Sequence, residues 1–304
     1  MEKTSHVSVM LKEVLELLEV EKGGSFLDCT LGGGGHTAGI LSANVVNKVV
    51  AVDRDSRAII RAGRRLEEFD GRVKIMHSAF SNIKEALNGE QFDGMLLDLG
   101  LSTDQLKENR GFSFKDDSAL DMRMDESQEN SAYLIVNKTP ERDLIQILRT
   151  GGVGKEASLV ARAIIKARPI EKTSELSRVI NQAIGGKNKE KKTNPSTVIF
   201  QAIRIAVNDE LGEIEGILRD APAMVKPGGR LAVISFHSLE DKAVTRTMRE
   251  WSSQGNYPAM WRGVVKEKSL GKLLTKKAVL PSEEEVNMNP ASRSARLRVF
   301  EFNN

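Results

Sequence analysis

The chain has 304 residues but only one cysteine and four histidines. Cys29 cannot form a disulfide within the chain, and its position inside an apolar stretch indicates core packing. The histidines are scattered, and Cys29 has no partner at the spacing of a metal site. The sequence therefore predicts neither a disulfide framework nor a bound metal. The four histidines are His6, His36, His77 and His237.

Long apolar runs are also missing. No run approaches the roughly 20 residues that a membrane-spanning helix needs, so no membrane partner is expected. The first six residues lack a signal-peptide core, and no Arg-rich transit segment precedes the first expected helix. These absences favour a cytoplasmic protein, and a mitochondrial matrix protein without its presequence would look the same.

The formal net charge is only +3, but it is unevenly distributed. Residues 242–304 contain 12 Lys and Arg against 6 Glu and no Asp. A basic C-terminal segment on a nearly neutral body favours a polyanionic partner. A solvated basic surface is the alternative, and charge alone does not choose between them.

The first hundred residues alternate between strand and helix patterns. Apolar residues at helical spacing predict an opening helix over residues 7–20. Strands are then expected at residues 25–30, 48–53, 73–76 and 92–98, with helices at 36–43 and 56–68. Such alternation predicts an α/β fold with a parallel sheet.

The alternation stops between residues 107 and 208, where helical patterns dominate. Helices are expected at residues 141–148, 158–167, 174–184 and 198–207, and the polar run 185–194 as a loop. A helix at 211–225, a Lys-Pro-Gly-Gly turn at 226–229 and a strand at 230–235 resume the α/β pattern. The sequence thus predicts an all-helical insertion in an α/β core, with segments 1–107, 108–208 and 209–304.

A glycine-rich loop follows the first expected strand. That strand contains Asp28, the loop is Gly32–Gly35, and the second strand ends on Asp53. Strand, glycine turn, helix and a strand closing on an acid are typical of a nucleotide-type cofactor site, in which the acid holds ribose hydroxyls. Glycines let the backbone approach such a ligand closely.

Two cofactors are compatible with this loop. Gly33, Gly35 and Ala38 fit the dinucleotide fingerprint, so an NAD-dependent oxidoreductase is one interpretation. In the other register, an acid followed by glycines at +4 and +6 resembles the first motif of S-adenosylmethionine-dependent methyltransferases. Thr30 stands at +2, where many of those enzymes carry glycine.

Two further motifs favour the methyl donor. Asp98 ends the fourth expected strand, where amino-methyltransferases place an acidic or amide residue facing the target amine. The Lys-Pro-Gly-Gly turn before the late strand is frequent in methyltransferases. Asp53 suits either class and does not discriminate.

In their order along the chain, the motifs resemble those of the small-subunit ribosomal RNA cytosine-N4 methyltransferases and their mitochondrial relatives. The matching segments are Gly33-Gly-Gly-His36, Asp53-Arg-Asp55, Asp98-Leu-Gly-Leu-Ser-Thr-Asp-Gln105, Arg110-Gly-Phe-Ser-Phe114, Leu120-Asp-Met-Arg-Met-Asp125, Phe200-Gln-Ala-Ile-Arg-Ile205, Ser235-Phe-His-Ser-Leu-Glu-Asp241 and Asn289-Pro-Ala-Ser-Arg-Ser-Ala-Arg-Leu-Arg298. The segment from Thr150 to Ala157 departs from the family pattern, which bears on the choice of RNA.

This resemblance implies a Rossmann-like class I methyltransferase sheet with an inserted helical domain, and S-adenosylmethionine as cofactor. It implies that the cofactor is bound by Gly34, Gly35, His36, Asp53, Phe80, Asp98 and Gln105. The target is then the N4 amine of a cytosine in small-subunit ribosomal RNA. A methyltransferase of another RNA or of DNA, the NAD enzyme and a non-catalytic ribosome-assembly factor are the alternatives.

Two residues are candidates for the chemistry. Asp98 can accept a hydrogen bond from the reacting amine, and His237, after the late strand, can relay a proton or read the base. The RNA base must leave its stack to enter such a site. Candidate phosphate contacts are Arg293, Arg296, Arg298 and the lysines of residues 187–192. A homodimer is the assembly considered.

Overall fold

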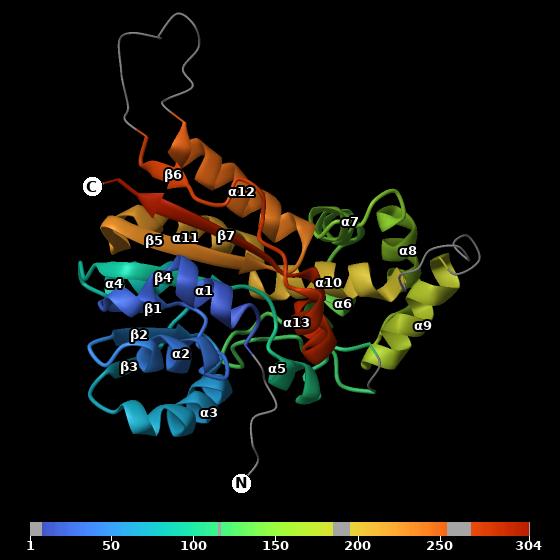
Figure 1. Ribbon diagram of the computed structural model, residues 1–304. Coiled ribbons are helices and arrows are strands. Elements are labelled where there is room, and N and C mark those ends of the chain that lie inside the picture. The colour runs from blue at the N-terminus through green and yellow to red at the C-terminus, as the bar shows by residue number, and fades with distance from the viewer. Residues whose placement is uncertain (1–7, 115–116, 185–194, 254–268, 304) are drawn as a thin grey trace, which may run out of the picture. The chain divides into compact units, whose positions relative to one another are not determined.

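The computed structural model describes residues 8–114, 117–184, 195–253 and 269–303. The chain divides into two units. Residues 1–100 and 212–304 form one, here called the sheet unit, and residues 101–211 form the other, here called the helical unit (Figure 1).

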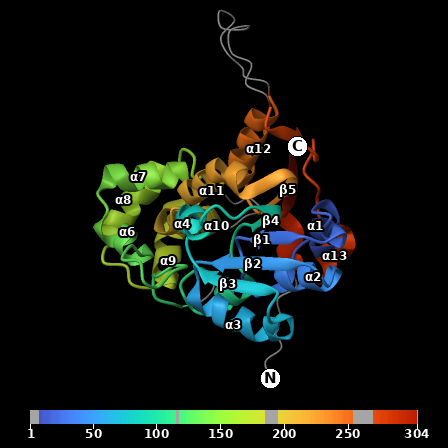
Figure 2. The ribbon, with the colours of Figure 1, turned by 90° about the vertical axis from the view of Figure 1, so that its left-hand side faces the viewer.

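The sheet unit is built on seven strands in the order β3-β2-β1-β4-β5-β7-β6. Strands β1 to β5 pair in parallel, whereas β7 runs antiparallel to both β5 and β6. Figure 2 shows β3, β2, β1 and β4 side by side in that order. The strands are β1 (Ser25–Asp28), β2 (Lys48–Asp53), β3 (Val73–His77), β4 (Phe92–Asp98), β5 (Val225–Ser235), β6 (Gly271–Leu273) and β7 (Arg296–Phe302).

Helices cover both faces of this sheet, so its central strands are apolar on both sides. On one face, Phe26 and its neighbours pack against α1 (Leu11–Leu17), α2 (Gly35–Ala43) and α3 (Ser56–Leu66). On the other, Leu27 belongs to a core formed with α4 (Phe80–Ala86), residues 212–224 of α11 (Glu210–Met224) and α12 (Ser238–Ser252). The alternation of Phe26 and Leu27 follows the two-residue period of a strand.

The helical unit has a core of its own. Buried side chains from its helices form one apolar cluster, which includes Leu148, Val160, Ile180 and Ile203. Phe114 and Phe200 contribute an edge-to-face ring pair with centroids 5.6 Å apart. Its helices are α5 (Thr103–Lys107), α6 (Ala132–Lys138), α7 (Glu141–Thr150), α8 (Ala157–Ala167), α9 (Thr173–Ile184) and α10 (Pro195–Asn208).

The parallel sheet is confirmed, and β2 and β4 begin and end at the predicted residues. The opening helix is shorter than predicted, because Met10 and Glu19 have φ of 52° and 53° and so interrupt a right-handed helix at both ends. β1 ends at Asp28 rather than at residue 30. After it, the N–H of Leu31 donates to the carbonyl of Val52 (2.9 Å), so the chain has turned towards β2.

The C-terminal part differs most from the sequence expectations. The Lys-Pro-Gly-Gly turn lies within β5 as an irregularity, where pairing jumps from Phe92–Val225 to Gly94–Arg230. The basic C-terminal segment contributes β7, α13 (Glu283–Met288) and the 3₁₀ turn Pro290–Ser294. Among the described residues, no helix combines the length and apolar composition needed to cross a membrane.

Candidate cofactor and catalytic site

Three carboxylates meet at one edge of the sheet. β2, β1 and β4 are neighbours and parallel, and they end on Asp53, Asp28 and Asp98. Ligands of open parallel sheets bind outside the carboxyl ends of the strands. The topology therefore places all three acids at the edge where ligands of such sheets bind.

Asp28 holds this edge of the sheet together through hydrogen bonds within the protein. Its side chain is fully buried and accepts hydrogen bonds from the hydroxyl of Thr37 (2.7 Å) and the N–H of Thr30 (3.0 Å). A buried carboxylate must be satisfied by donors, and Thr37 on α2 provides one of them. Asp28 thus joins the end of β1 to the first turn of α2.

The glycine loop is shaped by close packing. Gly34 has φ of +76° at the N-cap of α2, and a Cβ there would lie 3.2 Å from the Cβ of Ala62 on α3. At Gly35, a Cβ would overlap the side chain of Ser8. Glycine at these two positions therefore lets the loop pack closely against α3 and Ser8, and the positive φ of Gly34 favours glycine in addition.

Asp53 is held by two backbone donors. Its Oδ2 accepts from the N–H of Gly32 (2.7 Å) and its Oδ1 from the N–H of Asp55 (2.8 Å). Burial raises the pKa of Asp53 from 3.8 to about 6, although both N–H groups act in the opposite direction. The carboxylate oxygens can each accept a further hydrogen bond, as ribose hydroxyls require.

Asp98 has one engaged and one unengaged oxygen. Oδ2 lies 3.5 Å from Nδ1 of His36, whereas Oδ1 is buried and accepts no hydrogen bond from the described residues. Burial raises the pKa of Asp98 well above its usual value, and the negative charges of Asp28 and Glu240 raise it further. An acceptor oxygen without a partner is the feature expected where a ligand donates.

His36 is the side chain next to Oδ2 of Asp98. It is buried in the first turn of α2, with Nε2 3.0 Å from the carbonyl oxygen of Val9. Because a carbonyl only accepts, Nε2 carries the proton in this contact and Nδ1 faces Asp98.

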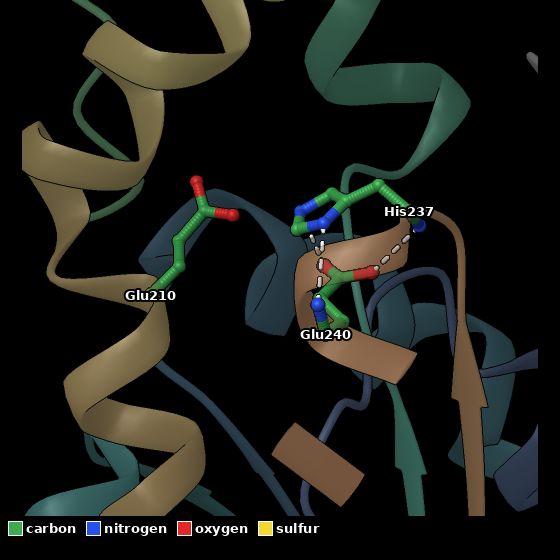
Figure 3. A group of neighbouring side chains, drawn as sticks. All are labelled: Glu210, His237 and Glu240. Carbon is green, nitrogen blue, oxygen red and sulfur yellow. Dashed lines mark hydrogen bonds and ion pairs between the residues drawn. The ribbon is translucent and has the colours of Figure 1, made fainter. Parts of the chain in front are cut away.

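His237 forms a capping box with Glu240 at the start of α12 (Figure 3). Its Nδ1 accepts the N–H of Glu240 (3.3 Å), and Oε2 of Glu240 accepts the N–H of His237 (3.1 Å) and of Phe236 (2.8 Å). Nε2 of His237 lies 3.1 Å from Oε1 of Glu240. Nδ1 is therefore engaged in capping, whereas Nε2 is buried and makes no hydrogen bond with the described residues.

The two remaining predicted cofactor residues are in different units. Phe80 is the first residue of α4 and packs, partly buried, against the core on that face of the sheet. Gln105 is buried in the helical unit, where its Oε1 accepts the N–H of Ser102 (2.9 Å) and its N–H donates to the Ser102 hydroxyl (3.2 Å). Gln105 thus completes a capping box at the start of α5.

The basic residues predicted to contact phosphates differ in exposure and in their partners. Arg298 makes two hydrogen bonds to Asp241 (2.6 and 3.2 Å) and is largely buried, so its observed role is structural rather than the predicted phosphate contact. Arg293 is exposed, and Arg296 lies 3.9 Å from Asp241 with its side chain 41% exposed. The lysines of residues 187–192 lie outside the described residues.

Several motifs of the helical unit prove to be structural. Asn208 donates to the carbonyl of Met122 (2.7 Å) and accepts from the N–H of Met124 (2.8 Å). Arg110 donates to the carbonyls of Arg123 and Met124. These contacts fold a long loop onto α10, and nothing in the local sequence pattern distinguishes them from ligand contacts.

The strand order β3-β2-β1-β4-β5-β7-β6, with β7 antiparallel, is that of the class I methyltransferase sheet. The glycine loop after β1 and the acids ending β2 and β4 lie at the carboxyl edge of that sheet. The sequence model of the MraW methylase family matches residues 3–303, and the chain belongs to this family.

Curated relatives match the chain nearly end to end. The ribosomal RNA small subunit methyltransferase H of Clostridioides difficile (strain 630) is 43% identical over 310 residues, covering 97% of this chain and 98% of the relative. The protein of that name from Geobacter sp. (strain M21) is 44% identical over 310 residues, covering 99% of each. That from Koribacter versatilis (strain Ellin345) is 40% identical, covering 98% of this chain and 94% of the relative.

Proposed function

We propose that the chain is an S-adenosylmethionine-dependent methyltransferase that methylates the N4 amine of a cytosine in small-subunit ribosomal RNA. The observation that carries the proposal is the match of the family over residues 3–303, with relatives of that printed name covered almost completely. The carboxyl edge of the sheet supplies the chemistry that such a reaction needs.

The residues at this edge fit the cofactor. Gly34 and Gly35 let the loop after β1 pack closely against α3 and Ser8, Asp53 offers acceptor oxygens for ribose, and Oδ1 of Asp98 is an acceptor without a partner among the described residues. When bound, S-adenosylmethionine supplies a methyl group attached to a positively charged sulfur. We propose that His36, Phe80 and Gln105 complete its binding site.

The lone pair of a cytosine amine is delocalised into the ring, so the amine is a poor nucleophile. Holding it in line with the methyl group lowers the barrier by reducing the entropy lost on reaction. An acceptor oxygen at the amine also favours the positive charge that develops on nitrogen. We assign this acceptor role to Oδ1 of Asp98.

Asp98 and His36 also provide a route for the amine proton. Because Nε2 of His36 carries its proton towards Val9, a proton on Oδ2 of Asp98 can point to Nδ1 of His36, 3.5 Å away. As Oδ1 accepts the amine proton, the proton on Oδ2 moves to Nδ1 of His36. The carboxyl group stays neutral, and the positive charge passes to the imidazole.

We propose further that the helical unit, residues 101–211, binds the RNA around the target base. It contains the segment from Thr150 to Ala157 that departs from the family pattern, which makes this segment a candidate determinant of RNA choice. Exchanging it for that of a relative tests the assignment through the methylated position.

The cellular compartment and the oligomeric state are separate proposals. The relatives named above are bacterial, so we place the reaction in the cytoplasm, and nothing favours the mitochondrial alternative. A homodimer stays a prediction, which sedimentation of the purified protein tests directly.

The deciding experiment supplies labelled S-adenosylmethionine with small ribosomal subunits that lack the modification, then digests the RNA and identifies the labelled nucleoside. N4-methylcytidine is the expected product. Label in another nucleoside, or transfer to DNA alone, contradicts the substrate. Thermal stabilisation by NAD but not by S-adenosylhomocysteine would instead support the oxidoreductase alternative.

A further inference from the structure

The backbone N–H of Asp98 lies where β4 loses its neighbour β1. The last register pair between these strands is Asp28–Leu96, and the N–H of Cys29 donates to the carbonyl of Leu96 (3.0 Å). β1 then turns away, because the N–H of Leu31 pairs with Val52 of β2. No register pair with β1 therefore reaches Asp98.

In a longer β1, a backbone carbonyl would accept the N–H of Asp98. Here the hydroxyl of Thr30 accepts it instead. Its Oγ1 accepts the N–H of Asp98 at 2.7 Å. The same hydroxyl lies 3.4 Å from Oδ1 of Asp28, to which it can donate its own proton. One side chain thus connects the ends of β1 and β4.

The carboxylate that anchors this hydroxyl is buried and hydrogen-bonded. Asp28 is fully buried and is fixed by the hydroxyl of Thr37 and by the N–H of Thr30 itself. On the other side of β4, the N–H of Leu99 donates to the carbonyl of Ile234 (2.9 Å). The backbone at Asp98 is therefore held from both neighbouring strands, on one side by Thr30.

This backbone anchor matters because the Asp98 side chain has few contacts of its own. Oδ1 has no hydrogen-bond partner among the described residues, and Oδ2 has only the 3.5 Å contact to His36. The direction of the carboxyl group is consequently set by the backbone from which it extends. A glycine at position 30, as in many methyltransferases, could not provide this bond.

We propose that Thr30 is a positioning residue, whose hydroxyl holds the Asp98 backbone so that the carboxyl group faces the reacting amine. This inference rests on the proposed function. Misplacement of a reacting group by about 1 Å can cost about a hundredfold in rate, so one backbone hydrogen bond at this point can affect turnover strongly.

Three variants test the inference. Thr30→Val keeps the shape of the side chain but removes the acceptor, whereas Thr30→Ser keeps the hydroxyl. Thr275→Val is the matched control, because it removes a hydroxyl that likewise accepts a backbone N–H, that of Val299 (2.9 Å), and takes no part in the hydrogen bonds of Asp28 and Asp98. The measurements are kcat and KM for small-subunit RNA, and the hydrogen exchange rate of the Asp98 amide.

We expect Thr30→Val to lower kcat at least about tenfold with KM nearly unchanged, and to speed exchange of the Asp98 amide. Thr30→Ser should restore both, and Thr275→Val should leave kcat and the exchange at Asp98 unchanged. An unchanged exchange rate or kcat in Thr30→Val overturns the inference, as does a serine variant that is equally impaired. If the wild type itself makes no N4-methylcytidine, the proposed substrate fails, and the amide exchange still decides whether Thr30 holds Asp98.

Discussion

The side chain of Asp53 accepts a 2.7 Å hydrogen bond from the backbone N–H of Gly32. Through this bond the end of β2 holds the glycine loop that follows β1. The carboxylate that is proposed to bind ribose therefore also fixes the loop beside it, and protonation of Asp53 affects both.

The first prediction concerns the pH dependence of cofactor binding. The pKa of Asp53 is raised to about 6 by burial, and only the ionised carboxylate can accept two hydroxyl donors. S-adenosylhomocysteine should therefore bind about tenfold more weakly at pH 5 than at pH 7, as calorimetry can measure. Asp53→Asn should bind weakly at both values, and an equal pH dependence in that variant would contradict the assignment.

The same shift predicts a stability effect in the ligand-free protein. The folded protein binds this proton more tightly than the unfolded chain, so ionisation costs stability. The free energy of unfolding contributed by Asp53 should fall as pH rises from 3.8 to 6, by at most about 3 kcal/mol. Comparing urea unfolding of the wild type and Asp53→Asn across this window isolates the contribution.

Gly34→Ala is the second prediction, with Gly63→Ala as its matched control. Gly34 has φ of +76° and a crowded Cβ position, so alanine should cost about 1–2 kcal/mol of stability and weaken S-adenosylhomocysteine binding. Gly63 lies in α3 with nothing within 4 Å of a Cβ, so alanine there should stabilise by about 0.5–1 kcal/mol. Thermal unfolding measures both, and equal effects would contradict the packing argument.

The sequence predicted the sheet edge because its signals are local. An apolar run ending on an acid and a run of glycines both lie within a few residues, which is why β2, β4 and their terminal acids were placed correctly. The contact of Thr30 with Asp98 joins residues 68 positions apart. No local pattern encodes such a contact, so Thr30 stood out only as a departure from glycine.

In the basic C-terminal segment, the sequence did not show which arginines are exposed. Its arginines suggested RNA phosphates, but positions 296 and 298 lie on β7, a strand whose pairing with β5 spans more than sixty residues. Charge pattern does not distinguish an arginine that faces solvent from one that faces Asp241. Only the fold shows that Arg293 is exposed whereas Arg298 is paired with Asp241.

The third prediction uses that difference. Arg298→Gln leaves the largely buried carboxylate of Asp241 without its main partner and should destabilise the protein by about 1–3 kcal/mol. Arg293→Gln, at an exposed position, should leave stability unchanged, weaken RNA binding and reduce its salt slope by about one. Chemical unfolding and filter binding at several salt concentrations check both. Weakened RNA binding without lost stability in Arg298→Gln would contradict the structural role.

His237 is tested by its replacement with asparagine, the fourth prediction. The Nδ1 atom of His237 caps α12, and asparagine is among the best capping residues. His237→Asn should therefore keep most of the stability, whereas His237→Ala should lose about 0.5–2 kcal/mol. Since the one hydrogen bond of the ring found among the described residues is the cap made by Nδ1, we expect kcat of the asparagine variant to stay within about threefold of wild type. A stable but inactive asparagine variant would instead establish the catalytic role predicted from the sequence.

Glu240→Gln is the final prediction, because it separates charge from capping. Glutamine can keep the capping box with His237, but it removes one of the two negative charges that raise the pKa of Asp98. The pKa of Asp98 should fall, and the limb of the kcat–pH profile that reports this group should move to lower pH. Burial, the larger cause, remains, so the pKa should stay above its usual value. A profile that moves to higher pH would show that Glu240 does not act on Asp98 through its charge.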